Sequence, residues 1–126
     1  MNTKFFFLTF LLSTLSLMSC SKNNYTTYEF KSEVEFLNGL PTTVSLIEYD
    51  ANNTIVATNK FLMKKNEVKK FTICDKSIKV KVFLQFDYGG QSGILAGWIT
   101  DVFFLSENMN TKIYLNANSR IDSREP

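Results

Sequence analysis

The stretch that decides the fold is Tyr28-Glu29-Phe30-Lys31-Ser32-Glu33-Val34-Glu35-Phe36, in which two kinds of residue alternate strictly. Every second residue is apolar or small, and every residue between them is charged. A period of two puts the two sets of side chains on opposite faces of an extended chain. The segment therefore predicts a β-strand with one buried face and one solvated face.

Six further segments have the same strand-like character, with turn residues between them, and no segment has apolar residues at helical spacing over eleven or more positions. Short strands at regular intervals without helices are typical of sandwiches and barrels. We expect one all-β domain over residues 28–118, a seven-stranded antiparallel β-sandwich of the immunoglobulin-like or transthyretin-like type, with a small antiparallel β-barrel as the alternative. The expected strands cover residues 28–36, 42–49, 54–63, 67–73, 77–87, 94–105 and 112–118.

The first twenty residues combine a short charged start, an apolar run and a closing cysteine. One lysine precedes a largely apolar run of 13 residues, 5–17, which is too short to cross a hydrocarbon core of about 30 Å. The run ends in Leu17-Met18-Ser19-Cys20, which resembles a lipobox. The resemblance implies cleavage before Cys20 and attachment of acyl chains, palmitate among them, to that cysteine; a plain secretory signal is the alternative.

These features divide the chain into a lipoprotein signal peptide (1–19), a lipidated tether (20–27), the β-sandwich domain (28–118) and a C-terminal tail (119–126). Several acyl chains hold a small domain on a membrane essentially permanently. Ser21 rather than Asp follows the lipidated cysteine, which by analogy permits transfer to the outer membrane. We expect a lipid-anchored protein of the cell envelope, and the sequence leaves open whether it faces the periplasm or the cell surface.

The whole chain resembles a loose group of small lipoproteins of Bacteroidota that carry a single β-sandwich domain of unknown function. The resemblance rests on the lipobox, on residues 78–86, on the strand of residues 98–105 and on the ending Arg124-Glu125-Pro126. The group supplies no catalytic residues, so the resemblance implies a fold and a location in the cell envelope but no activity.

Positive charge is concentrated in residues 60–81, which hold eight lysines and two acidic residues, a charge of +6. The rest of the chain after residue 19 has five basic and ten acidic residues, a charge of −5. Such a segment is typical either of a face that binds a polyanion or an acidic partner, or of solvated lysines that keep a sheet edge from pairing. The candidate contacts are Lys64, Lys65, Lys69, Lys70, Lys79 and Lys81.

Aromatic residues offer a second candidate contact surface. Trp98 follows the glycine-rich segment 88–93 and is either a stacking platform for a sugar ring or a core residue. Phe103 and Phe104 are consecutive, so in a strand they point to opposite faces, and one of them lies at the interface of the sheets or is exposed. The candidate aromatic contacts are Trp98 and Phe103.

The composition argues against catalysis. Histidine is absent from the 126 residues, which removes the usual metal ligand and the side chain that most readily titrates near neutrality. We expect no catalytic residue, no metal and no cofactor. The net charge of +2 also argues against nucleic acid as a partner. We expect a non-catalytic binding or inhibitory role toward a protein or glycan, or alternatively an accessory or anchoring subunit of a surface fibre or envelope complex.

Overall fold

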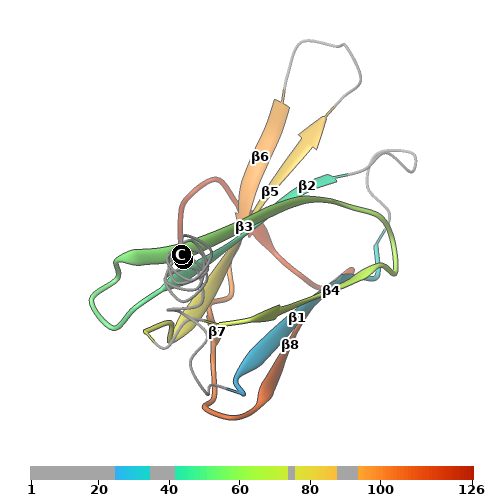
Figure 1. The fold of residues 1–126 in the computed structure, drawn as a ribbon. Helices are drawn as coiled ribbons and strands as arrows, with labels where there is room; N and C mark the ends of the chain where they lie inside the picture. The colour runs from blue at the N-terminus through green and yellow to red at the C-terminus, as the bar shows by residue number, and fades with distance from the viewer. Residues whose placement is uncertain (1–24, 35–41, 74–75, 88–93) are drawn as a thin grey trace, which may run out of the picture.

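The computed structural model describes residues 25–34, 42–73, 76–87 and 94–126, and these residues form nine β-strands and no helix (Figure 1). Cys20 and the lipobox lie outside the described residues. The strands are β1 (Thr27–Ser32), β2 (Thr42–Tyr49), β3 (Ile55–Met63), β4 (Val68–Thr72), β5 (Lys79–Asp87), β6 (Ile94–Ile99), β7 (Phe103–Phe104), β8 (Asn110–Leu115) and β9 (Ile121–Asp122).

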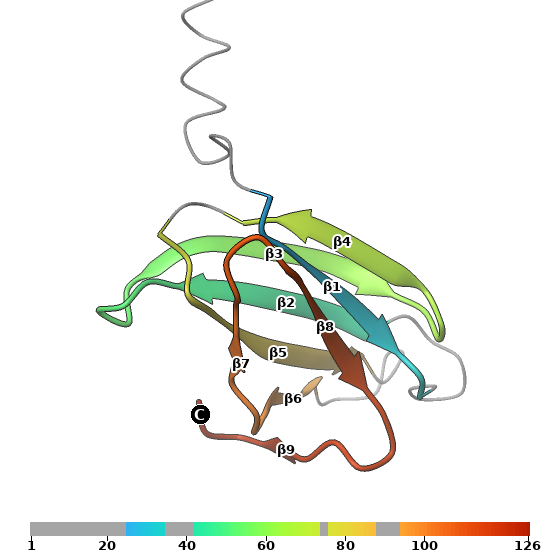
Figure 2. The same cartoon turned by 90° about the horizontal axis from the view of Figure 1, so that it is seen from below.

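The strands form two layers (Figures 1 and 2). One sheet has three strands in the order β4-β1-β8, and the other has six, in the order β3-β2-β5-β6-β9 with β7 also paired to β5. The prediction of an all-β fold is confirmed, and the described strands lie in two separate sheets rather than in one closed barrel.

Direction and number of strands differ from the expected seven antiparallel strands. β1 and β8 run parallel, with Phe30 opposite Ile113. The segment expected as one strand over residues 94–105 is divided into β6 and β7, and the expected C-terminal tail contributes β9. Alternation of side chains is the same in parallel and antiparallel strands, so the residue pattern could not reveal the direction of β1 relative to β8.

The break between β6 and β7 is a shift of two residues along β5. Trp98 lies opposite Phe83, whereas Phe103 lies opposite Val80. Because an even shift keeps each side chain on its face of the sheet, Phe104 shares the face of Trp98, and Phe103 shares the face of Val80. Sequence spacing alone did not reveal this irregularity.

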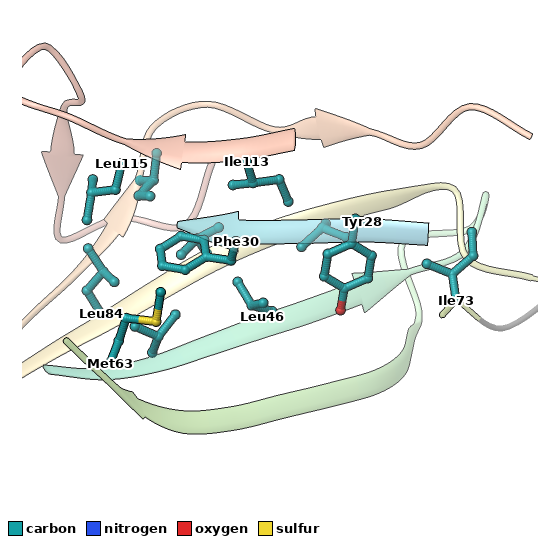
Figure 3. Packing of buried hydrophobic residues seen from close by; sticks show 12 residues of the cluster. Tyr28, Phe30, Leu46, Met63, Ile73, Leu84, Ile113 and Leu115 are labelled. Atoms are coloured by element: carbon teal, nitrogen blue, oxygen red, sulfur yellow. The ribbon is translucent and has the colours of Figure 1, made fainter. Parts of the chain in front are cut away.

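The core lies between the two sheets, where alternate residues of β1, β2, β5 and β8 point inward (Figure 3). Tyr28 and Phe30 of β1 are fully buried, as the opening alternation predicts. Ile78 precedes β5 and is 40% exposed. The buried cluster contains Tyr28, Phe30, Val44, Leu46, Met63, Ile73, Val80, Val82, Leu84, Ile99, Ile113 and Leu115.

Gly97 allows β9 to pack against β6. A Cβ atom built on Gly97 overlaps the Cγ2 of Ile121 and approaches the carbonyl oxygen of Asp122 to 3.2 Å. Residues 121–122 pair with Trp98 and Ile99. The C-terminal segment can pack against β6 in this position because residue 97 has no side chain.

We predict that Gly97→Ala destabilises the fold by about 1–3 kcal/mol, the usual cost of an overpacked site, and loosens residues 121–125. Urea unfolding measures the free energy of unfolding, and the NMR amide signals of residues 121–125 report whether this segment stays packed against β6. Ala96→Ser is the matched control, because Ala96 is the exposed neighbour on β6. Unchanged stability and unchanged tail signals in Gly97→Ala would contradict this view of β9.

Candidate functional site

The outer face of the six-stranded sheet is the face turned away from the core, and it carries charged and aromatic side chains. On β5, Val80 and Val82 point into the core, so the intervening lysines and Phe83 point outward. Register places Tyr49 of β2 opposite Lys79 and Ile47 opposite Lys81 on this face. Its outward residues on β5 are Lys79, Lys81, Phe83 and Gln85.

The C-terminal segment crosses part of this outer face. After β9 the chain end lies beside β7 (Figure 2), and the Glu125 carboxylate meets two groups of the sheet. The hydroxyl of Tyr49 donates to Oε1 of Glu125, and the ammonium of Lys81 lies 3.3 Å from the same oxygen. The Lys81 Nζ atom also lies 4.5 Å from the centroid of the Tyr49 ring, a cation–π contact.

These contacts bury side chains that strand alternation alone would leave in water. Tyr49 is 4% exposed and Lys81 is 9% exposed. The side chain of Glu125 remains 45% exposed. The buried cation therefore belongs to the sheet, and its carboxylate partner belongs to a segment at the surface.

Beside this ion pair lies a pocket of about 560 Å³. Phe104 forms part of the pocket wall and is 66% exposed. The Lys79 ammonium donates a hydrogen bond to Oδ1 of Asn53, and both residues line the pocket. The pocket combines two lysines, the Glu125 carboxylate, a phenol hydroxyl, an amide and an aromatic ring, and such a combination of placed polar groups with an apolar wall is typical of binding sites. Its lining residues are Tyr49, Asn53, Lys79, Lys81, Val102, Phe104, Glu125 and Pro126.

Asn53 reaches the pocket from the β2–β3 turn. It has a positive φ of 61°, a conformation that asparagine tolerates better than most residues. Asp50 fixes the turn by accepting hydrogen bonds from the amides of Asn52 (2.9 Å) and Thr54 (3.0 Å). The polar turn expected between the second and third strands thus also positions one wall of the pocket.

The electrostatics of the pair follow from its geometry. The hydrogen bond from Tyr49, and after it Lys81, holds the pKa of Glu125 below its ordinary value of 4.5. Burial, together with the bond to the Glu125 carboxylate, raises the pKa of Tyr49. Near neutral pH the site therefore joins a carboxylate, an ammonium and a neutral phenol.

The six lysines proposed as contacts do not share one surface. Lys64 and Lys65 are exposed between β3 and β4, and Lys70 is exposed on β4. Lys69 lies opposite Phe30, pairs with Glu67 at 3.0 Å and sits over the Phe61 ring. Lys79 and Lys81 alone among the six line the pocket, so the +6 segment is divided among separate surfaces of the domain.

The two aromatic candidates also separate. Trp98 is half-buried on the outer face, where its ring centroid lies 4.9 Å from that of Phe83. Phe103 points the other way and packs against the core. The exposed member of the Phe pair is Phe104. The sequence analysis named Phe103 as the aromatic contact of this pair, whereas the structure packs Phe103 against the core, because it shares the face of Val80, and exposes Phe104. No signal in the sequence indicated Tyr49 and Glu125, because their contact depends on pairing between distant segments.

A second polar cluster lies inside the sandwich, around Glu48, which is 2% exposed. Its carboxylate accepts hydrogen bonds from the Ser77 hydroxyl (2.6 Å), the Tyr28 hydroxyl (3.0 Å) and the Asn59 amide (3.2 Å). These donors come from both sheets, so the cluster links the layers. Because it is enclosed and its hydrogen bonds are satisfied, we assign it a structural role.

In the described ranges, the Cys, Asp and Glu side chains form no group of three or more that would hold a metal ion. None of the residues in these ranges belongs to a helix with the length and apolarity needed to span a bilayer.

Comparison with protein-family models, with curated proteins and with solved structures finds no match to this chain.

We predict that acid releases the C-terminal segment. The pKa of Glu125 is lowered in the folded state, so its stabilising effect is present above pH 4.5 and is lost as the pH falls through the lowered pKa. An NMR titration should show the signals of Phe104 and of residue 125 moving in this acid range in the wild type, and those of Phe104 staying in place in Glu125→Gln.

Asp122 needs its own control, because its pKa is also lowered, by hydrogen bonds from Arg124. In Asp122→Asn the acid-induced movement of Phe104 should persist. A titration of Phe104 that is the same in the wild type and in Glu125→Gln would show that Glu125 does not hold the segment.

Proposed function

We propose that this chain is a lipid-anchored cell-envelope protein with a non-catalytic binding role, and that it binds through the outer face of its six-stranded sheet. The observation that carries the proposal is the pocket beside the Tyr49–Glu125–Lys81 contact, which joins buried charge to an exposed aromatic wall. Binding sites commonly combine a largely apolar wall with a few placed polar groups.

A non-catalytic role is supported by the state of the acidic groups. The Glu48 carboxylate is enclosed by hydrogen-bond donors in the core, and that of Glu125 is paired with Lys81. Catalysis needs an acid, base or nucleophile within reach of a substrate, and the chain has no histidine to fill that role.

Of the two sandwich types expected, strand order favours the transthyretin-like one. In an immunoglobulin domain the first strand pairs with the second. Here β1 lies between β4 and β8, and β2 lies between β3 and β5 in the other sheet. We therefore propose a transthyretin-like sandwich as the carrier of the binding face.

The lipid anchor is proposed from the lipobox, with palmitate among the acyl chains on Cys20 and the outer membrane as the destination. The expected tether of residues 20–27 is shorter than predicted, since β1 begins at Thr27 and Thr26 is buried. The residues before them would hold the domain close to that membrane, with either the periplasm or the cell surface in front of it.

The alternative role, an accessory or anchoring subunit of a surface fibre or envelope complex, has one favouring observation. β3 is an outermost strand of nine residues, and Ile55 and Leu62 on it are 56% and 63% exposed. A long edge with exposed apolar side chains can accept a strand from another chain.

We predict that Cys20→Ala abolishes lipid attachment. In cells labelled with radioactive palmitate, the wild-type protein should carry label and fractionate with membranes, and the variant should lose both properties. Cys74→Ala is the matched control and should remain labelled. Absence of label from the wild type would leave the chain as an ordinary secreted protein and refute the anchor.

We predict that Phe104→Ser weakens binding about tenfold, the usual effect of truncating a central aromatic contact, in a screen of acidic glycans and acidic peptides with the full-length protein in mild detergent. Met109→Ser is the matched control, since Met109 is 61% exposed and does not line the pocket. Equal binding by the two variants, or no binding by any of the three proteins, would refute the proposed face.

A further inference from the structure

The contacts of the chain's own C-terminal segment indicate which kind of ligand the pocket binds. In the part of the chain that the structure describes, Glu125 is the one carboxylate within ion-pair distance of Lys81. An ammonium covered to this degree is costly unless a carboxylate accompanies it. The subsite formed by Lys81 and the Tyr49 hydroxyl therefore requires an acidic occupant.

The present occupant is held by few contacts. β9 has only two residues, which pair with Trp98 and Ile99, and one further main-chain bond joins the Thr100 amide to the Arg120 carbonyl at 3.0 Å. Arg124 has an 88% exposed side chain. A short segment whose main chain makes few hydrogen bonds to the sheet can be exchanged for another of the same chemistry, because local opening costs least where such bonds are few.

The occupant also shows which class of molecule fits. Its main chain pairs with the edge of β6, an interaction that an extended peptide supplies and a sugar does not. Its glutamate enters the Lys81–Tyr49 subsite, and Pro126 lines the same pocket as the Phe104 ring. The half-buried Lys79 lines the pocket as well, so a second acidic side chain would find a cation there.

We propose that the outer-face pocket binds an extended, glutamate-bearing peptide segment of a partner protein, which displaces residues 121–126 and places its own glutamate against Lys81 and Tyr49. The inference rests on the proposed function and deepens it by naming the partner class. The C-terminal segment then competes with the partner for the pocket. The apparent affinity for the partner is therefore set by the difference between the free energies with which the partner and the segment occupy the pocket.

The test uses fluorescence anisotropy with the full-length protein in mild detergent. The probe is a labelled peptide with the sequence of residues 119–126, and the same peptide with glutamine in place of its glutamate is the control probe. Glu125→Gln should bind the glutamate peptide about tenfold more tightly than the wild type, because the chain's own competitor is weakened. It should bind the glutamine peptide about tenfold more weakly than the glutamate peptide.

Variants of the sheet locate the binding. Lys81→Met combined with Glu125→Gln should lose at least about tenfold in affinity for the glutamate peptide, whereas Lys112→Met combined with Glu125→Gln should lose none. Lys112 is exposed on β8 of the other sheet. Tyr49→Phe in the same background removes one hydroxyl and little volume, so it remains informative if Lys81→Met fails to fold; it should weaken binding several-fold.

Three results would overturn the peptide proposal: equal affinity for the two peptides, no gain from Glu125→Gln, or affinity retained in both sheet variants. A fourth concerns polygalacturonate, an acidic glycan. If Glu125→Gln binds it in a Lys81-dependent manner and binds neither peptide, the partner class is wrong while the binding face survives. If Glu125→Gln binds none of these probes and Phe104→Ser changes no binding in the wider screen, both proposals fail.

Discussion

Burial of the Lys81 ammonium is the constraint on which the outer half of this structure depends. Lys81 stands on β5 between Val80 and Val82, whose side chains belong to the core, so alternation forces its own side chain onto the opposite face. There the Tyr49 ring and the C-terminal segment cover it. A covered ammonium needs a carboxylate close by. Glu125 supplies that group, so one contact both makes the burial tolerable and holds the end of the chain to the sheet.

The same contact depends on small features far from it in sequence. Glu125 reaches the sheet because β9 pairs with β6, and β9 can lie there because Gly97 has no side chain to displace Ile121. The two-residue shift after β6 keeps Phe104 on the outer face, next to the end of the chain. A turn held by Asp50 presents Asn53 from the other side. The pocket is therefore a product of sheet register rather than of any continuous motif.

Sequence patterns predicted the features that depend on local alternation. The buried positions of β1, the all-β class and the placement of Phe103 and Phe104 on opposite faces follow from a period of two within single strands. The patterns did not predict the parallel pairing of β1 with β8, the division of residues 94–105, or β9, because these depend on which strands become neighbours. For the same reason a run of lysines looked like one face, although Lys69 and Lys81 lie on different sheets.

This domain has two carboxylates with different surroundings, one with a structural role and one at the proposed binding site. Glu48 accepts hydrogen bonds from donors of both sheets and is enclosed in the core, so removing it would leave several buried donors without their acceptor. Glu125 meets one hydroxyl and one ammonium, from a segment with a two-residue strand and a half-exposed side chain. Exchange with an outside carboxylate is therefore feasible only at Glu125. An incoming carboxylate there would restore both interactions that the departing glutamate gives up, so Lys81 has an acidic partner before and after the exchange.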